Sequence, residues 1–219
     1  MVNVSNITFT SKNGTIIKCP YFKHAAPSDT LAIVFPGHGY NCDMPLLYFC
    51  SQAALQLGCD VINLKYYYQC AKLKFEFTDD NYLKIANDCH GILKSEAINI
   101  NAYKHIIFAS KSLGTVIAGK TAVLFGKLTI NHFFLTPLRK TIQHIERESC
   151  TVIVGTEDGF FSKDDIEKVN GFSLPIVHVI DGADHSLEIM GDCIKSLEIL
   201  TDITKIWMGF ACSIKERCP

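Results

Sequence analysis

Ser112, Asp158 and His185 are the residues of this sequence whose types could together perform nucleophilic chemistry. A serine hydroxyl is a poor nucleophile at neutral pH unless a base takes its proton, and histidine is best matched to that task. A carboxylate fixes the tautomer of the histidine and stabilises the imidazolium that forms. Each of the three residues follows an apolar run that is typical of a strand, so we expect them to meet at one edge of a sheet.

The surroundings of Ser112 resemble a nucleophile elbow, a sharp turn between a strand and a helix. The apolar run at 106–109 is followed by Ser110-Lys-Ser112-Leu-Gly114 and then by small and apolar residues that are typical of a helix. Small residues are needed on both sides of the nucleophile because strand and helix pack closely around the turn. Ser110 stands where the usual Gly-x-Ser-x-Gly pattern has its first glycine. An ordinary loop could carry the same residues, so the motif needs support from the rest of the chain.

Two alternatives concern the residues beside these positions. Glu157 is adjacent to Asp158 and could be the acid in its place. Lys111 precedes Ser112 and could suggest a Ser–Lys mechanism, but in an elbow its side chain is expected to point away from the serine.

The order of the predicted elements indicates a mostly parallel sheet with helices on both faces. Several apolar runs are continuous, as expected of strands that are buried on both sides. No repeat or linker interrupts the pattern, so residues 1–219 are expected to form one domain. The strands are expected at residues 4–10, 15–21, 31–35, 60–66, 106–109, 131–136, 150–154 and 175–180. The helices are expected at 43–57 with Asp43 as the cap, 79–93, 115–125, 138–148, 162–169 capped by Ser162, and 190–210 with an interruption.

Composition excludes several classes of partner. The formal net charge of −1 gives no electrostatic footprint for nucleic acid or for an anionic membrane surface. No apolar run approaches the length of a transmembrane helix, and the first residues lack the pattern of a signal peptide. The ten cysteines include no Cys-x-x-Cys pair. We therefore expect a cytoplasmic protein with reduced cysteines, with disulfides as the less favoured alternative.

Four segments resemble the motifs that carry chemistry in the α/β-hydrolase superfamily. The order serine, acid, histidine along the chain is the order that this superfamily uses. The whole chain is similar to small members of the esterase-like and dienelactone-hydrolase-like kinds. The matching segments are residues 35–40 (Phe-Pro-Gly-His-Gly-Tyr), 109–114 (Ala-Ser-Lys-Ser-Leu-Gly), 154–158 (Val-Gly-Thr-Glu-Asp) and 180–186 (Ile-Asp-Gly-Ala-Asp-His-Ser).

The resemblance implies a catalytic role for each motif. Ser112 would be the nucleophile, Asp158 the acid and His185 the base. The backbone N–H groups of Leu113 and Tyr40 would form the oxyanion hole, and two such donors lower a barrier by several kcal/mol, roughly. The resemblance implies no metal and no organic cofactor. The segment between residues 137 and 150 has room for one helix only, so no large cap domain is expected.

Aromatic residues and a histidine near the strand ends are candidates for contact with substrate. They are His38, Tyr66 and Phe160. Each has a plainer explanation, because a histidine after such a strand often braces its loop and aromatic residues often belong to the core.

The function implied is a serine hydrolase that cleaves a carboxylic ester, a thioester or a related acyl bond of a small molecule. Two alternatives use the same pocket. One is a non-catalytic protein that binds a ligand or a partner, since a fold does not imply a function. The other is an acyltransferase that transfers the acyl group to an acceptor other than water. The oligomeric state is left open by the sequence.

Overall fold

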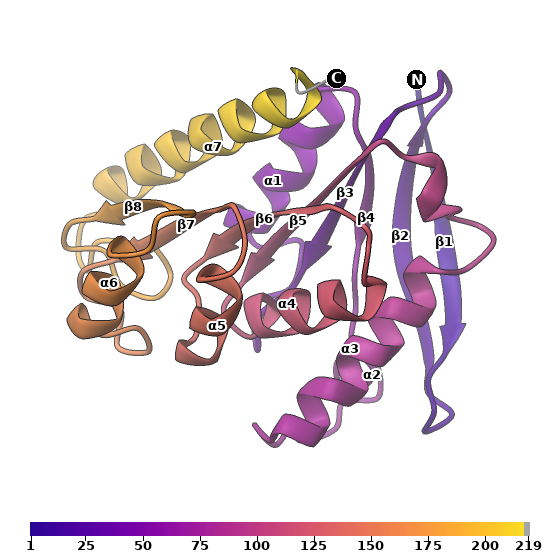
Figure 1. Ribbon diagram of the computed structural model, residues 1–219, viewed down its shortest axis with the longest axis horizontal. Coiled ribbons are helices and arrows are strands. Elements are labelled where there is room, and N and C mark those ends of the chain that lie inside the picture. The colour runs from indigo at the N-terminus through magenta and orange to yellow at the C-terminus, as the bar shows by residue number, and fades with distance from the viewer. Residues whose placement is uncertain (217–219) are drawn as a thin grey trace.

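Eight strands form one sheet at the centre of the computed structural model, which describes residues 1–216 (Figure 1). The strand order across the sheet is β1-β2-β4-β3-β5-β6-β7-β8. β1 and β2 form an antiparallel hairpin, β2 pairs antiparallel with β4, and the other neighbours pair in parallel. The strands are β1 (Val2–Thr10), β2 (Ile16–His24), β3 (Thr30–Phe35), β4 (Asp60–Asn63), β5 (His105–Lys111), β6 (Ile130–Leu135), β7 (Cys150–Gly155) and β8 (Ile176–Ile180).

Helices cover both faces of the sheet, as the sequence predicts (Figure 1). α1 and α7 lie on one face and contact each other, whereas α3, α4, α5 and α6 lie on the other. The α-helices are α1 (Pro45–Gln56), α2 (Tyr67–Cys70), α3 (Asp79–Leu93), α4 (Leu113–Phe125), α5 (Ile142–Ile145), α6 (Lys163–Asn170) and α7 (Cys193–Glu216). Two short 3-10 helices, η1 (Ile100–Ala102) and η2 (Arg139–Thr141), complete the elements.

The alternation of side chains along β5 divides the interior into two cores. Ile106 and Phe108 pack in the core under α3 and α4, and Ile107 and Ala109 pack in the core under α1 and α7. Trp207 of α7 is fully buried in the second core, and its indole N–H donates to the carbonyl of Cys50 in α1. β5 is therefore held on both faces and by a strand on each edge, so the residue that follows it has a fixed place.

Several helix and strand boundaries differ from those that the sequence predicts. α1 begins at Pro45, and its N-cap residue is Met44, not Asp43. Met44 makes no capping bond, and the N–H of Leu46 in the first turn donates instead to the hydroxyl of Tyr40. The strand expected at 60–66 ends at Asn63 and is followed by α2. The helix expected at 138–148 is only η2 followed by the short α5. α7 runs without interruption for 24 residues because its apolar positions face α1 and the sheet along its length.

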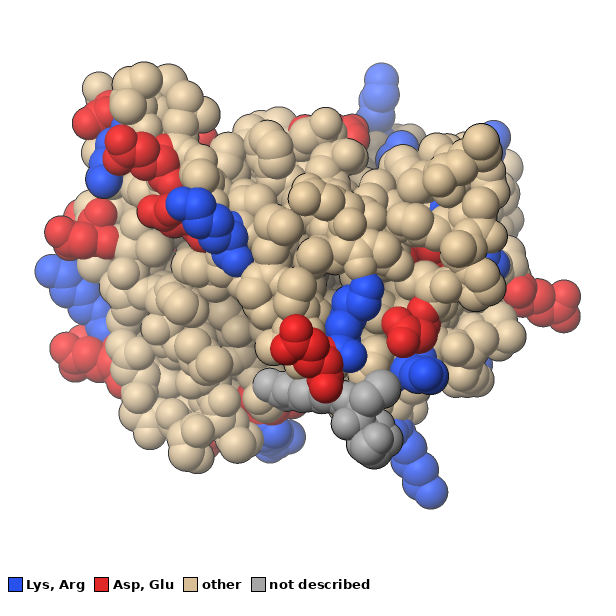
Figure 2. Space-filling model, turned by 90° about the horizontal axis from the view of Figure 1, so that it is seen from above, with Lys and Arg blue, Asp and Glu red and all other residues tan. Residues whose placement is uncertain are grey.

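Nine of the ten cysteines lie within residues 1–216. All nine cysteines within residues 1–216 are free, and Cys218 lies outside this range. No helix in the same range is long and apolar enough to cross a membrane. On the face seen in Figure 2, acidic and basic side chains are interspersed and form no large field of one sign.

Gly155 provides a test of how the strand ends are packed. A Cβ atom at this position would lie 2.0 Å from the carbonyl oxygen of Ala183, which is backbone and cannot move aside alone. We expect Gly155→Ala to lower the free energy of unfolding by about 3 kcal/mol in urea denaturation, because the added methyl group overpacks a closed site. Gly209→Ala is the matched control, since its Cβ would meet nothing within 4 Å. It should raise that free energy by about 0.5–1 kcal/mol, because alanine is the better helix former. Equal effects at the two positions would contradict the close packing at Gly155.

Candidate functional site

Ser112, His185 and Asp158 meet at the carboxyl edge of the sheet. Nε2 of His185 lies 2.8 Å from Oγ of Ser112. Nδ1 of His185 lies 2.9 and 2.8 Å from the two carboxylate oxygens of Asp158. Asp158 is buried, whereas the imidazole is partly exposed. We call these three side chains the Ser–His–Asp cluster, and its geometry lets a proton pass from the hydroxyl to the imidazole.

The backbone at Ser112 has the strained conformation of a sharp turn. Its φ of 52° and ψ of −119° are unusual for a residue with a side chain. Such a conformation costs on the order of 1–3 kcal/mol, and it persists only where the surroundings impose it. α4 begins at the next residue, which places Ser112 at the positive end of the helix dipole.

Small residues on both sides of Ser112 are required by backbone contacts. A Cβ atom at Gly114 would lie 2.4 Å from the carbonyl oxygen of Phe35. Ser110, where the usual motif has glycine, is fully buried, and its hydroxyl lies 3.5 Å from the carbonyl oxygen of Phe133 in β6. The serine is therefore accommodated by the neighbouring strand.

The loops that carry the acid and the histidine are joined to each other. The N–H of Glu157 donates to the carbonyl of Ala183, so the backbone before Asp158 is bonded to the loop that holds His185. Asp158 also accepts the N–H of Phe160 at 2.8 Å, which orients its carboxylate. Of the two adjacent acids, it is the side chain of Asp158 that reaches His185.

A tight turn after β3 faces Ser112. The N–H of Gly37 donates to the carbonyl of Tyr40 at 2.8 Å, and a Cβ atom at Gly37 would lie 3.4 Å from Cβ of Ser112. The N–H groups of His38, Tyr40 and Leu113 have no acceptor within residues 1–216. These groups are therefore free to donate to a ligand beside Ser112.

Residues of the segment after β4 hold this turn from behind. The hydroxyl of Tyr66 donates to the carbonyl of Pro36 at 3.0 Å, and the side-chain amide of Gln69 donates to the carbonyl of Gly37 at 3.2 Å. Tyr66 is 1% exposed, so it supports the turn and presents almost no surface to a ligand. Sequence reasoning did not identify Gln69, because a single amide between tyrosines gives no recognisable motif.

His38 and Phe160 are exposed at the rim of the site. The His38 ring lies 5.0 Å from the ring of Phe77 and within about 6 Å of Tyr68 and Phe75, so it belongs to an aromatic cluster. The ring of Phe160 lies 4.7 Å from the imidazole of His185 and is 65% exposed. Both rings are thus accessible to a ligand that approaches Ser112.

Lys111 is buried beside the cluster but makes no hydrogen bond to Ser112 in the part of the chain that the structure describes. Its ammonium donates to the carbonyl of His185 at 2.8 Å and to the hydroxyl of Thr136 at 3.0 Å. Burial lowers the pKa of Lys111 to about 8, and the nearby carboxylates oppose this shift only in part. Sequence reasoning predicted that the side chain points away from the serine, but it did not predict its contacts.

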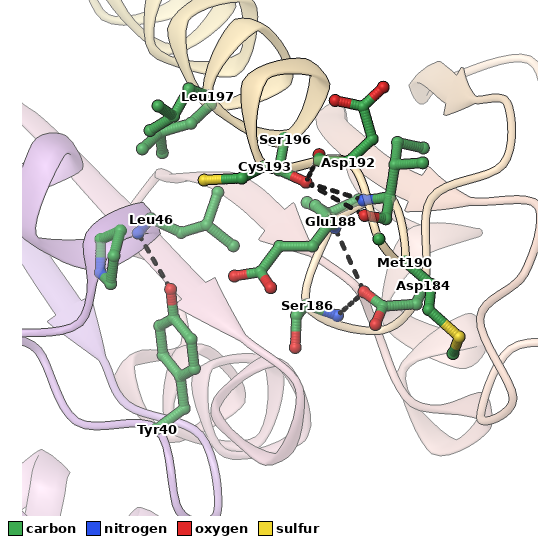
Figure 3. A pocket seen from close by; sticks show the side chains of 15 residues that line it. Tyr40, Leu46, Asp184, Ser186, Glu188, Met190, Asp192, Cys193, Ser196 and Leu197 are labelled. Atoms are coloured by element: carbon green, nitrogen blue, oxygen red, sulfur yellow. Dashed lines mark hydrogen bonds between the residues drawn. The ribbon is translucent and has the colours of Figure 1, made fainter.

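A cleft of about 590 Å³ lies next to the loop that carries His185 (Figure 3). Figure 3 shows the hydroxyl of Tyr40 bonded to the N–H of Leu46 on one side of the cleft, and Asp184 bonded to the N–H of Ser186 on the other. Burial raises the pKa of Tyr40 to about 12, so its hydroxyl is neutral. The apolar residues that line the cleft include Pro45, Leu46, Leu187, Ile189, Met190, Leu197 and Leu200. Within residues 1–216, no group of three or more His, Cys, Asp or Glu residues is arranged to hold a metal ion.

No model of a protein family matches the sequence, and no curated protein sequence matches it. Solved structures match over almost their whole length. Est1E from Butyrivibrio proteoclasticus, solved with ferulic acid, is 12% identical, with 97% of this chain and 100% of that chain covered at a TM-score of 0.72. An α/β serine hydrolase homologue from Coxiella burnetii is 14% identical, with 95% and 97% covered at a TM-score of 0.70.

A third similar structure is described as lacking a lid. It is a serine hydrolase without a lid from Xanthomonas campestris, 12% identical, with 96% of this chain and 94% of that chain covered at a TM-score of 0.69. The segment between β6 and β7 of the present chain holds only η2 and α5, in agreement with that architecture. The strand order, the elbow after β5 and these similarities together show that the chain has the α/β-hydrolase fold.

Proposed function

We propose that this protein is a serine hydrolase that cleaves an ester, a thioester or a related acyl bond of a small molecule. The observation that carries the proposal is the Ser–His–Asp cluster, in which one imidazole bridges a hydroxyl and a buried carboxylate. The neighbours that share the fold include an α/β serine hydrolase homologue, a serine hydrolase without a lid, and Est1E, which was solved with ferulic acid. Those descriptions support a hydrolase, and the acyl specificity is our proposal.

The first half of the reaction forms an acyl-enzyme. Nε2 of His185 takes the hydroxyl proton as Oγ of Ser112 attacks the substrate carbonyl carbon. Asp158 accepts the Nδ1–H bond and stabilises the imidazolium. The imidazolium then gives its proton to the leaving group, and the bond between the carbonyl carbon and the leaving group breaks. The acyl group remains on Ser112 as an ester.

The second half repeats these steps with water. His185 takes a proton from water, the resulting hydroxide attacks the acyl carbon, and Ser112 leaves with the proton that the imidazolium returns. In both halves the carbonyl oxygen becomes negatively charged. We propose that the free N–H groups of Leu113 and Tyr40 hold this oxyanion, with the N–H of His38 as the alternative second donor.

The rim suggests where the two parts of the substrate lie. Phe160 offers aromatic surface beside His185, and the His38 cluster offers it beside the turn that faces Ser112. The cleft beside Tyr40 offers apolar surface. Asp184, Glu188 and Asp192 also line the cleft, so an anionic group would meet like charges there. We therefore expect uncharged esters to be better substrates than esters that carry a carboxylate.

Asp158 and its neighbour Glu157 allow a matched test of the acid. Asp158→Asn replaces the carboxylate that orients the imidazole, so we expect labelling of Ser112 by a fluorophosphonate to slow by about three orders of magnitude. Glu157→Gln, the matched control, should label at the wild-type rate. The measurement is the time course of adduct formation by intact-protein mass spectrometry. The assignment is wrong if the two variants exchange these behaviours.

Ser112→Ala tests the hydrolase proposal itself. We expect it to lower kcat for a p-nitrophenyl ester by about 10⁴- to 10⁶-fold with little change in KM, because the nucleophile is lost and the binding surface stays. A panel of p-nitrophenyl esters of increasing chain length, with a thioester, a lactone and a carboxylate-bearing ester, then ranks the acyl groups. Wild-type protein that binds these esters without turnover or covalent labelling would instead support the non-catalytic alternative.

A further inference from the structure

Lys111 is a buried cation that the proposed reaction does not use. It is the last residue of β5 and is 2% exposed. Its side chain continues the face of β5 that carries Ile107 and Ala109, in the apolar core under α1 and α7. Burying an ammonium group has a large desolvation cost. A methionine would fill a similar volume in this core without that cost, so packing alone does not explain the lysine.

The ammonium of Lys111 joins three loops that surround Ser112. It donates to the carbonyl of His185 itself at 2.8 Å, in the loop after β8. It donates to Oγ1 of Thr136 at 3.0 Å, directly after β6. It also lies 4.7 Å from the centre of the Tyr40 ring, in the turn after β3, at a distance suited to a cation–π contact. The positive charge of the ammonium strengthens both hydrogen bonds.

Two of these loops contain strained backbone next to the contacts of Lys111. Thr136 has a φ of 41°, and Leu187, two residues after His185, has a φ of 61°. Both values are unusual for residues with a branched or bulky side chain, so the surroundings must impose them. The bonds from Lys111 end beside both residues, on the hydroxyl of Thr136 and on the carbonyl of His185.

We propose that Lys111 is a positioning residue, whose charged ammonium holds the loop of His185 and the turn of Tyr40 in register with Ser112. This inference rests on the proposed function. It adds that a cation one residue before the nucleophile controls the position of the base through the base's own backbone carbonyl. The lysine does not touch the reacting atoms and takes no proton from Ser112.

The same geometry makes the contacts of the Lys111 ammonium sensitive to pH. The acidic groups near the ammonium are Asp158 after β7 and Asp184 and Glu188 after β8, and Tyr40 faces it from the turn after β3. Burial nevertheless lowers the pKa of Lys111 to about 8. As pH rises through that value, the folded protein loses the ammonium charge. The charge-assisted bonds and the cation–π contact then weaken, so reactivity of Ser112 should decline.

The effect on folding has the opposite sign. Because the pKa of Lys111 is lower in the folded protein than in the unfolded chain, the protonated lysine disfavours folding below about pH 8. Loss of the proton relieves this cost as pH rises. Replacing Lys111 by an uncharged residue should therefore reduce reactivity without lowering the unfolding midpoint, a combination that a purely structural role would not produce.

The experiment compares wild type with Lys111→Met, Lys111→Arg and the matched control Lys205→Met, whose lysine is exposed and distant in sequence. The rate of fluorophosphonate labelling of Ser112 is measured from pH 6 to pH 10. Amide hydrogen exchange of residues 181–189 is measured on the same samples. Wild type and Lys205→Met should lose labelling rate as pH rises through about 8. Lys111→Met should label up to about 100-fold more slowly at pH 7 and show no such decline, because a slightly misplaced base is costly.

Lys111→Arg should recover part of the rate and keep it to pH 10, since a guanidinium stays charged. Hydrogen exchange of residues 181–189 should be faster in Lys111→Met than in wild type. Wild-type labelling rates and the same alkaline decline in Lys111→Met would overturn the proposal. If wild type and every variant resist labelling, the proposed hydrolase function fails instead. In that case hydrogen exchange alone tests whether Lys111 holds the loop of His185. Unchanged exchange of residues 181–189 in Lys111→Met would overturn that role.

Discussion

The whole site depends on one imidazole that must bridge two partners on different loops. The two ring nitrogens of His185 each make a hydrogen bond of 2.8 Å, one to Ser112 and one to Asp158. Neither partner is near the histidine in sequence, so only the parallel pairing of β5, β6, β7 and β8 brings the three loops to one edge. The bonds between the loops, above all that from Glu157 to the carbonyl of Ala183, then set the distances. A strand register shifted by one residue would break the bridge.

The three side chains of the cluster were predictable from the sequence, whereas the residues that support them were not. Ser112 and Asp158 follow the buried strands β5 and β7, and His185 follows the edge strand β8. Their chemistry needs all three residue types in one place. The sequence alone could not decide between Asp158 and Glu157, because both are carboxylates. Only the structure shows that the side chain of Asp158 is the one that points toward His185. The role of Lys111 was hidden for a different reason. Its partners are a backbone carbonyl and a hydroxyl far away in sequence, which no local motif encodes.

The order of the main strands and helices along the chain could also be predicted, since continuous apolar runs and helical periodicity can be recognised in a single sequence. Boundaries were less accurate where tertiary contacts override local signals. α7 runs unbroken past Thr201 because its buried stripe packs on α1. The segment after Pro137 forms only short helical turns, although its composition suits a longer helix. Tyr66 illustrates the same limit, because the sequence left open whether it contacts substrate or belongs to the core, and in the structure it is buried and supports the turn after β3.

The central claim is that this geometry makes Ser112 the reacting nucleophile beside the free N–H groups of the elbow. A crystal structure of the protein after reaction with a fluorophosphonate tests it most directly. The account predicts phosphorus bonded to Oγ of Ser112 and a phosphonyl oxygen that accepts from the N–H of Leu113 and from one N–H of the turn at 38–40. An adduct on another residue, or a phosphonyl oxygen that points away from the N–H of Leu113, would contradict it.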